Sequence, residues 1–256
     1  MTHSWNATGA MLSLTFAAAC TGTRTKEPVV STTGDKTAVS EAGTTAAKRG
    51  KSLVRMVNAI PGDRAFDITA DDRAVFFEVG YKTVTPYTEI GDNVVKFHVR
   101  TASDTALTAD NTETLTNGNR YTIIAMPSKD GGVKLSIVKD DVVPDSGKTR
   151  LRVFHAAPGL ADVDVLIEGQ KDPLFDNVGF GSEAGFKDLD PATATVVVRR
   201  DNPPLNVLRI QKMHLDAGKM YTIVVAGAAP TSLATITITD AVRSYATAGG
   251  GAGGNH

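Results

Sequence analysis

The second half of this 256-residue sequence contains serine, histidine and aspartate side chains that could together perform acyl transfer. Ser182 lies in the stretch Gly-Phe-Gly-Ser-Glu-Ala-Gly, and His155 and Asp164 could supply the base and the orienting carboxylate of a hydrolase triad. A nucleophile elbow requires Gly-x-Ser-x-Gly on a turn from a strand into a helix, and the sequence offers neither that spacing nor a helical pattern after Ser182. We therefore predict that the protein is not an enzyme, with a hydrolase as the remote alternative.

Aspartates could also bind calcium, which takes oxygen ligands. Asp162 and Asp164 alternate along one expected strand and share a face, but a full site needs six or more oxygens. Asp140, Asp141 and Asp145 gather in one short polar stretch, where a metal ion could stiffen a junction between domains. An ordinary solvated linker explains the same residues. We predict no metal and no other cofactor, with those three aspartates as the residues to test.

Two further classes of function find no support in the sequence. The formal net charge is −1, so no basic surface indicates a nucleic-acid partner. No Walker loop, dinucleotide fingerprint or pair of metal-spaced histidines is present. His98 and His214, like His155, stand singly in expected strands and are predicted to be structural or surface residues.

The elements that hold these residues occur twice. Residues 151–159, Leu-Arg-Val-Phe-His-Ala-Ala-Pro-Gly, have a degraded copy at residues 54–62, Val-Arg-Met-Val-Asn-Ala-Ile-Pro-Gly. Two later pairs of blocks recur in the same order, residues 76–87 with 175–186 and residues 115–125 with 215–226. A period of about 100 residues is typical of a whole β-sandwich domain. We therefore predict a duplication, with repeats at residues 52–140 and 149–243 joined by a short linker at 141–148.

Each repeat is expected to contain about seven short strands. Val163, Val165 and Ile167 share one face of an expected strand, and Ile236 and Ile238 are predicted to face inward between outward threonines. Gly- and Pro-containing pairs punctuate the strands, and no helical period occurs. The sequence thus predicts an all-β protein, with two tandem immunoglobulin/fibronectin-III-like β-sandwich domains after a disordered tether.

A pair of tyrosines makes the prediction of the fold more specific. Tyr121 and Tyr221 each end a Leu-x-x-Gly-x-x-Tyr stretch that resembles the tyrosine corner of fibronectin type III domains. The resemblance implies that each hydroxyl bonds back to the backbone.

Arginine and aspartate flank the Pro-Gly turn of each repeat. Arg55 and Asp67 do so in the first repeat, and Arg152 and Asp164 in the second. We predict a charge-assisted pair across the two strands of a hairpin in both repeats. Two separate solvated charges are the alternative, and the recurrence favours the pair.

The ends of the chain differ from its middle. Residues 1–20 have an apolar run that stops at Cys20, and Ala17-Ala18-Ala19-Cys20 resembles a bacterial lipobox, in which the cysteine is lipidated. A short buried segment with an unused thiol is the alternative. Residues 21–51 contain few bulky apolar side chains and are predicted to be a flexible tether, and residues 244–256 a disordered Gly-rich tail.

Residues 151–169, 175–186 and 215–227 resemble the domain of unknown function 4397 family. The resemblance implies an exported bacterial or archaeal protein, often with tandem copies, and it supplies no active site. We expect a lipoprotein of the bacterial cell envelope, held to the membrane by its N-terminal lipid and facing the periplasm or the exterior.

The expected function is a non-catalytic surface binding or adhesion module whose partner is a cell-surface polysaccharide or an envelope protein. The loops Pro61–Ala65 and Pro158–Ala161 are its candidate contact points. The alternative is a mechanical spacer or scaffold, with or without calcium stiffening the domain junction.

Overall fold

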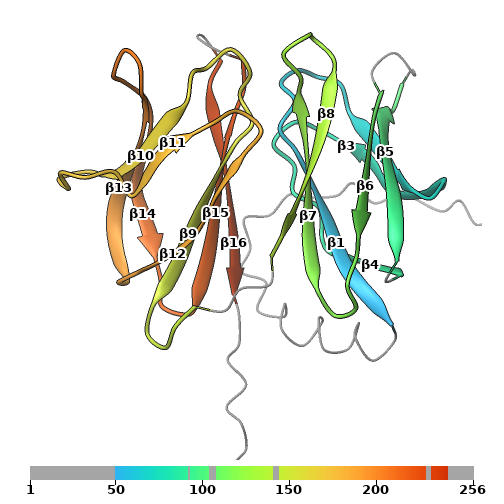
Figure 1. The fold of residues 1–256 in the computed structure, drawn as a ribbon, viewed down its shortest axis with the longest axis horizontal. Coiled ribbons are helices and arrows are strands. Elements are labelled where there is room, and N and C mark those ends of the chain that lie inside the picture. Colours follow the sequence, from blue (N-terminus) through green and yellow to red (C-terminus); the bar gives the residue numbers. More distant parts are fainter. Residues whose placement is uncertain (1–49, 92, 104–107, 141–143, 229–231, 242–256) are drawn as a thin grey trace, which may run out of the picture. The chain divides into compact units, whose positions relative to one another are not determined.

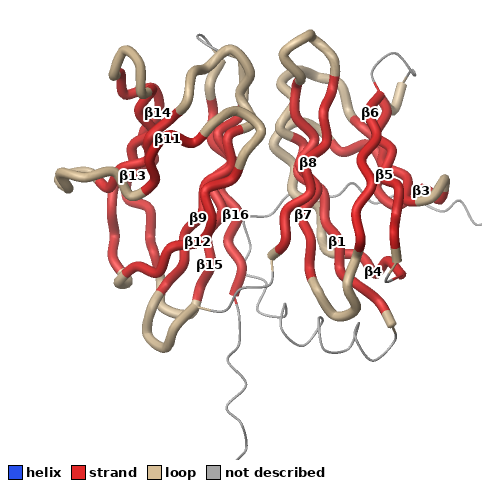
Figure 2. The backbone as a smooth tube through the Cα atoms, in the orientation of Figure 1, coloured by secondary structure: helices blue, strands red, loops and turns tan. Residues whose placement is uncertain are grey.

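The computed structural model of this chain describes residues 50–241, apart from residues 92, 104–107, 141–143 and 229–231. Every regular element in this part of the chain is a β-strand, as Figures 1 and 2 show. Among the described residues, no helix is long and apolar enough to cross a membrane.

Several sequence-based expectations fall outside the described residues. These are the signal segment at residues 1–20 with Cys20, nearly all of the tether at 21–51, Asp141, and the tail at 244–256.

The first repeat has eight strands where about seven were expected. They are β1 (Lys51–Asn58), β2 (Phe66–Ala70), β3 (Arg73–Val79), β4 (Thr88–Gly91), β5 (Val94–Thr101), β6 (Thr108–Thr114), β7 (Arg120–Pro127) and β8 (Val133–Lys139). They form two four-stranded sheets with the orders β4-β1-β7-β8 and β3-β2-β5-β6.

The second repeat has the same arrangement. Its strands are β9 (Thr149–His155), β10 (Val163–Ile167), β11 (Phe175–Val178), β12 (Glu183–Leu189), β13 (Ala192–Arg200), β14 (Leu205–Leu215), β15 (Lys219–Ala226) and β16 (Ala234–Ala241). The sheet orders are β12-β9-β15-β16 and β11-β10-β13-β14, which match those of the first repeat strand for strand. The predicted all-β class with two tandem β-sandwich domains is confirmed.

Each sandwich encloses a core of its own. In the first repeat, Met56 and Ile123 from one sheet pack with Phe66 and Phe97 from the other. In the second repeat the core is built from the corresponding strands, with Val153 and Ile223 facing Val163 and Val196 among others. Burying one such side chain contributes roughly 1.5–3 kcal/mol, so each repeat has a substantial hydrophobic core.

One sheet of each repeat is buried on both of its faces. We call the sheets β4-β1-β7-β8 and β12-β9-β15-β16 the docking sheets, and the other two the outer sheets. A third apolar cluster joins the docking sheets, and includes Val57, Ile124 and Val138 from the first repeat with Phe154 and Val224 from the second. The central strands are therefore apolar almost throughout.

The parallel pairing of β1 with β7, and of β9 with β15, fits this burial. Parallel strands are usually covered on both faces, and they then read as continuous apolar runs rather than as alternating ones. Ile236 and Ile238 illustrate the consequence, because both are buried as predicted but lie in the cluster between the docking sheets instead of the core of their own repeat.

Both tyrosine corners make the hydrogen bond that the resemblance implied. The Tyr121 hydroxyl accepts a hydrogen bond from the backbone N–H of Thr116 at 2.9 Å, and the Tyr221 hydroxyl accepts one from Asp216 at 3.0 Å. These bonds are local, so each repeat fastens its own loop.

Candidate functional site

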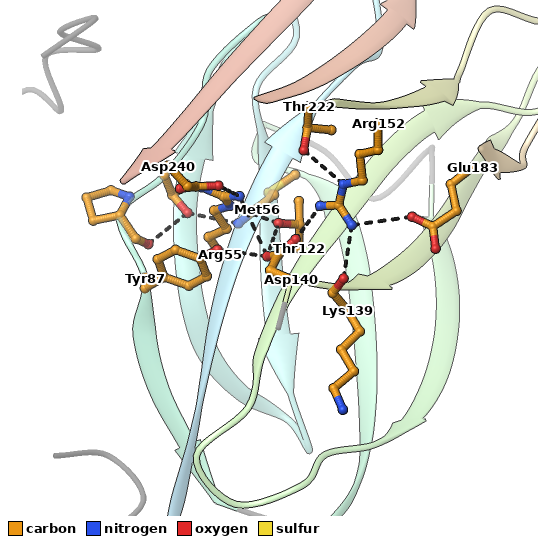
Figure 3. A network of polar contacts seen from close by, with 12 residues as sticks. Arg55, Met56, Tyr87, Thr122, Lys139, Asp140, Arg152, Glu183, Thr222 and Asp240 are labelled. Carbon is orange, nitrogen blue, oxygen red and sulfur yellow. Dashed lines mark hydrogen bonds and ion pairs between the residues drawn. The ribbon is translucent and has the colours of Figure 1, made fainter. Parts of the chain in front are cut away.

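The most elaborate polar arrangement in the described residues lies between the two docking sheets. Arg55, Asp140, Arg152 and Asp240 are its charged members, and at most 7% of any of these residues is exposed. Figure 3 shows them at close range, together with the threonines and the aromatic ring that contact them. Buried charges are costly unless each is paired and hydrogen-bonded, so every contact here matters.

Arg55 projects from β1 and forms a bidentate ion pair with the carboxylate of Asp240 in the second repeat. Its Nη1 donates to Asp240 Oδ1 at 2.8 Å and its Nη2 to Asp240 Oδ2 at 2.7 Å. Its Nε donates to the Thr122 hydroxyl at 2.8 Å, and the guanidinium lies 4.5 Å from the centre of the Tyr87 ring. Such a two-pronged pair fixes orientation as well as charge.

Arg152 occupies the corresponding place on β9 and reaches back into the first repeat. Its Nη2 donates to Asp140, and its Nη1 donates to the backbone carbonyl of Lys139 at 3.0 Å. Its Nε donates to the Thr222 hydroxyl at 2.8 Å, and the guanidinium lies 4.7 Å from the centre of the Phe186 ring.

Glu183 is the third carboxylate of the network and contacts Arg152. Its Oε2 accepts a hydrogen bond from Arg152 Nη1 at 3.3 Å, while its side chain is 39% exposed. This contact lies at the rim of the network, where solvent weakens an ion pair.

Asp140 is the carboxylate with the most donors. Besides Arg152, it accepts hydrogen bonds from the Tyr87 hydroxyl at 2.7 Å and the Thr122 hydroxyl at 2.5 Å. Burial by itself would raise its pKa, but the charges of Arg55 and Arg152 outweigh burial, so the pKa of Asp140 lies below its ordinary value. Asp140 is therefore charged at neutral pH.

Tyr87 is neutral in this setting. Burial, opposed by the charge of Arg55, raises the pKa of Tyr87 well above its ordinary value. Its hydroxyl therefore keeps its proton and donates a hydrogen bond to Asp140.

The predicted pairs of Arg55 with Asp67 and of Arg152 with Asp164 are wrong. Each arginine lies on a docking sheet, whereas each aspartate lies on the outer sheet of the same repeat. The Pro-Gly segment between them crosses from one sheet to the other and does not form a hairpin. Residues that flank it therefore cannot be cross-strand neighbours.

Asp67 and Asp164 instead make equivalent contacts within the outer sheets. Asp67 pairs with Arg100 on the neighbouring strand at 3.3 Å, and Asp164 pairs with Arg199 at 2.7 Å. Each also accepts a backbone N–H from a residue with positive φ at an irregularity of the next strand. The carboxylates thus stabilise a bulge that recurs in both repeats.

His155 is a structural residue and is not available as a base. It is fully buried, its Nδ1 accepts the backbone N–H of Ala157 at 3.3 Å, and its Nε2 lies 3.3 Å from the carbonyl oxygen of Ala161. Burial lowers the pKa of His155. Asn58, at the same place in the first repeat, likewise accepts the N–H of the residue two positions later, Ile60, at 2.9 Å.

The other members of the hypothetical triad are also engaged elsewhere. Ser182 is exposed and lies in a turn, where its backbone N–H donates to Gly179 and its carbonyl accepts from the backbone of His155. Asp164 lies on the outer sheet beside Arg199. In the part of the chain that the structure describes, these three residues form no hydrolase triad.

Two of the three candidate calcium ligands, Asp140 and Asp145, lie within the described residues. Asp140 already accepts hydrogen bonds from Arg152, Thr122 and Tyr87, and Asp145 is an exposed turn residue. Among the described residues, no group of three or more His, Cys, Asp or Glu side chains could hold a metal ion. The oxygens of Asp140 are thus already engaged by donors of the protein.

A second, smaller feature lies on the outer sheet of the first repeat. It is a hollow of about 290 Å³ lined by Thr69, Asp71, Asp72, Lys96 and His98. Asp71 and Asp72 have φ values of 46° and 63° and form the two-residue turn between β2 and β3.

Several side chains of this hollow already form hydrogen bonds or ion pairs within the protein. Asp71 is occupied, since its Oδ1 accepts the backbone N–H of Lys96 at 2.9 Å. Lys96 Nζ and His98 Nδ1 both contact Asp110, at 2.8 and 2.5 Å. The hydrogen bond with Asp110 raises the pKa of Lys96, so the amine is charged. The hollow thus combines donors and acceptors at the surface.

The two loops that the sequence suggested as contact points differ in how much of their residues is exposed. In Pro61–Ala65 the residues are exposed or half-buried, whereas in Pro158–Ala161 Leu160 is buried in the core of its repeat. The two loops therefore do not present equivalent surfaces.

Sequence reasoning missed the contact between the repeats, although a signal for it exists. The stretches Tyr-Thr-Ile-Ile-Ala-Met at residues 121–126 and Tyr-Thr-Ile-Val-Val-Ala at 221–226 lack the polar alternation of a strand with one solvated face. Arg55 and Arg152 each interrupt a further such run. Buried charges within strands covered on both faces require partners from the facing sheet.

Two solved structures resemble the chain at low similarity. One is a family 26 carbohydrate-binding module from Eubacterium rectale in complex with maltoheptaose, with 10% identity, a TM-score of 0.23, and coverage of 76% of this chain and 98% of the module. The other is a "putative cell adhesion protein" from Bacteroides ovatus, with 12% identity, a TM-score of 0.25, and coverage of 75% of this chain and 98% of that one. TM-scores this low carry no inference about function.

Among curated proteins, a search finds no match to this sequence. A family model, by contrast, matches residues 52–166 and again residues 150–250, in the tandem arrangement that the repeat predicted. With most of its length matched, the chain belongs to the family described as Domain of unknown function (DUF4397).

Proposed function

We propose that this protein is a non-catalytic binding module of the bacterial cell envelope, which uses the outer sheet of its first repeat to hold a hydroxyl-rich polysaccharide or a polar protein segment. The observation that carries the proposal is the hollow lined by Thr69, Asp71, Asp72, Lys96 and His98. Carboxylate, hydroxyl, imidazole and ammonium groups at one place offer both donors and acceptors to such a ligand.

The different exposure of the docking sheets and the outer sheets supports the same function. The docking sheets are covered on both faces, so the outer sheets and the loops remain as the surfaces available to a partner. On the outer sheet of the first repeat, Phe77 on β3 is 54% exposed and adds an aromatic ring that a sugar or a peptide could cover.

The cellular location is part of the proposal. Lipidation at Cys20 would hold the protein at a membrane, and residues 21–51 would act as the tether. Metabolic labelling with a lipid precursor, with Cys20→Ala as the control, tests this separately from binding. Label retained by the Cys20→Ala variant would contradict the lipoprotein hypothesis.

Retention experiments test the binding function. Purified residues 51–245 are passed over isolated envelope polysaccharides and over solubilised envelope proteins of the source organism. We expect saturable retention on one of the two fractions. In the double variant Asp72→Ala/His98→Ala we expect retention to fall at least tenfold, because both side chains line the hollow.

The matched control removes an acid and a histidine from the second repeat. Glu168 pairs with Arg209, and His214 contacts the hydroxyl of Thr193; both are exposed. The double variant Glu168→Ala/His214→Ala should bind like the parent protein. Equal losses in both double variants would show that the hollow is not the site, and no retention on either fraction would overturn the binding function.

A mechanical spacer is the second candidate, and the buried charge network favours it. Arg55 and Arg152 each cross to the other repeat, so the two sandwiches are held in a fixed relation. If the protein binds neither fraction but the distance between spin labels on the two outer sheets is sharply distributed, the spacer function is supported. A broad distribution would contradict it.

A further inference from the structure

The contacts between the repeats come from equivalent positions. Arg55 is the register partner of Thr122 in the pairing of β1 with β7, and Arg152 is the register partner of Thr222 in the pairing of β9 with β15. The aspartates also correspond, because Asp140 directly follows the partner of Tyr121, and Asp240 directly follows the partner of Tyr221. Each repeat therefore carries an arginine and an aspartate at the same two places on its docking sheet.

The ion pairs that also form hydrogen bonds between these positions are crossed, whereas one longer ion pair, between Arg55 Nη2 and Asp140 Oδ2 at 3.6 Å, lies within the first repeat. Arg55 of the first repeat holds Asp240 of the second, and Arg152 of the second repeat holds Asp140 of the first (Figure 3). The arginine position of the first repeat thus contacts the aspartate position of the second, and the aspartate position of the first repeat contacts the arginine position of the second. This is the pattern of an interface with two-fold symmetry.

The apolar part of the interface follows the same rule. Val57 and Phe154 occupy equivalent positions, as do Ile124 and Val224, and all four belong to the cluster between the docking sheets. An aromatic ring lies against each arginine at equivalent positions, Tyr87 in the first repeat and Phe186 in the second. Apolar, aromatic and charged side chains thus recur at equivalent positions on the two faces.

We infer that the docking face is self-complementary, so that a single repeat pairs with a second copy of itself through the same contacts. In a pair of second repeats, Arg152 of each copy meets Asp240 of the other, and both charges of each face are satisfied. The partner that the face fits is therefore another copy of this domain.

Each repeat has what it needs to exist as a separate unit. The two cores contain no residue in common with the cluster between the docking sheets, and each tyrosine corner closes within its own repeat. Separation exposes the docking face and leaves both cores intact.

The first experiment starts from the whole protein. A specific protease site placed within residues 144–148 lets the folded chain be cut, and the halves are separated and examined by native mass spectrometry and by circular dichroism. We expect each folded half to form dimers of its own kind as well as pairs with the other half. Folded halves that stay monomeric, or that pair only with the other half, would overturn the inference.

Charge reversal in the second half tests the contacts themselves. The Asp240→Arg half presents two positive charges, and the Arg152→Asp half presents two negative ones. Each alone should lose its dimer, with a dimer dissociation constant at least tenfold higher. Mixed in equal amounts they should pair, because every arginine again faces an aspartate. Failure of the mixture to pair would contradict the crossed arrangement.

If a released half unfolds, an intact tandem chain decides the question. In this chain the first repeat is replaced by a second copy of residues 149–241, so that both docking faces are identical. Docked copies should unfold in one cooperative transition, which Asp240→Ala in a single copy lowers. Two copies that unfold independently, with no effect of that substitution on the other copy, would overturn self-complementarity.

Discussion

Arg55 and Asp240 lie 185 positions apart in the sequence and form a two-pronged ion pair with N–O distances of 2.8 and 2.7 Å. The contact joins β1, the first strand of the first repeat, to β16, the last strand of the second. It is buried, since the two side chains are only 5% and 9% exposed. The pair thus adds a buried contact that stabilises the docked arrangement of the two sandwiches.

Removing one partner of this pair should be strongly destabilising. Asp240→Ala leaves the Arg55 charge buried without its carboxylate, which typically costs about 3–5 kcal/mol of unfolding free energy. The measurement is urea unfolding followed by circular dichroism. The matched control is Asp188→Ala, because Arg150 also grips Asp188 with two hydrogen bonds but the pair is more exposed. The control should lose less than about 1 kcal/mol, and equal losses would contradict the importance of burial.

Tyr87 and Tyr81 give a second matched comparison. Tyr87→Phe removes the hydroxyl that donates to Asp140 at 2.7 Å, so we expect a loss of about 1.5–3 kcal/mol, the range for a hydrogen bond to a charged group. The Tyr81 hydroxyl is buried without a hydrogen-bond partner among the described residues, so Tyr81→Phe should be neutral or slightly stabilising. Urea unfolding measures both, and a larger loss in Tyr81→Phe would contradict the assignment.

Acid should weaken the contact between the repeats through Asp140. The folded-state pKa of Asp140 lies below its ordinary value, so its stabilising effect is complete above the unfolded-state pKa of about 3.9 and is lost as pH falls through the lower folded-state pKa. Asp140→Asn should lower stability at neutral pH and flatten its dependence on pH below about 4. The measurement is unfolding free energy between pH 2 and 7, and an unchanged slope in the variant would contradict this role of Asp140.

His155 should contribute a separate dependence on pH. Burial lowers its folded-state pKa, so below the unfolded-state value of about 6.5 the unfolded chain binds a proton that the folded protein takes up less readily. Stability should therefore fall as pH drops from about 6.5 towards the lower folded-state pKa. His155→Asn copies the Asn58 arrangement of the first repeat and should fold while losing this dependence. If the variant retained the full dependence of stability on pH, a group other than His155 would be its cause.

Calcium should leave the melting temperature unchanged. Asp140 is held by Arg152, Thr122 and Tyr87, so a metal ion could bind it only by breaking the contact between the repeats. Differential scanning calorimetry with calcium or with a chelator tests this. A calcium-dependent rise that Asp145→Asn abolishes would restore the hypothesis of a metal-stiffened junction.

Much of the architecture follows from the sequence alone. Repetition of the Arg-x-x-x-x-x-Pro-Gly block around Arg55 and Arg152 reveals the duplication, and short apolar strands between Gly and Pro turns reveal the all-β class. The hydrogen bonds of Tyr121 and Tyr221 were also predictable. The strand pattern and the two tyrosine hydrogen bonds depend on residues close together in the chain, where backbone geometry limits the possibilities.

The partners of the buried charges depended on the tertiary structure. Arg55 and Asp67 are near in sequence, but the chain between them crosses from the docking sheet to the outer sheet, so Asp67 meets Arg100 and Arg55 meets Asp240. A strand pattern shows that a side chain is buried, but it does not show which surface covers it. Ile238 makes the same point, because alternation predicted its burial while only the packing of two domains determined that the other repeat covers it.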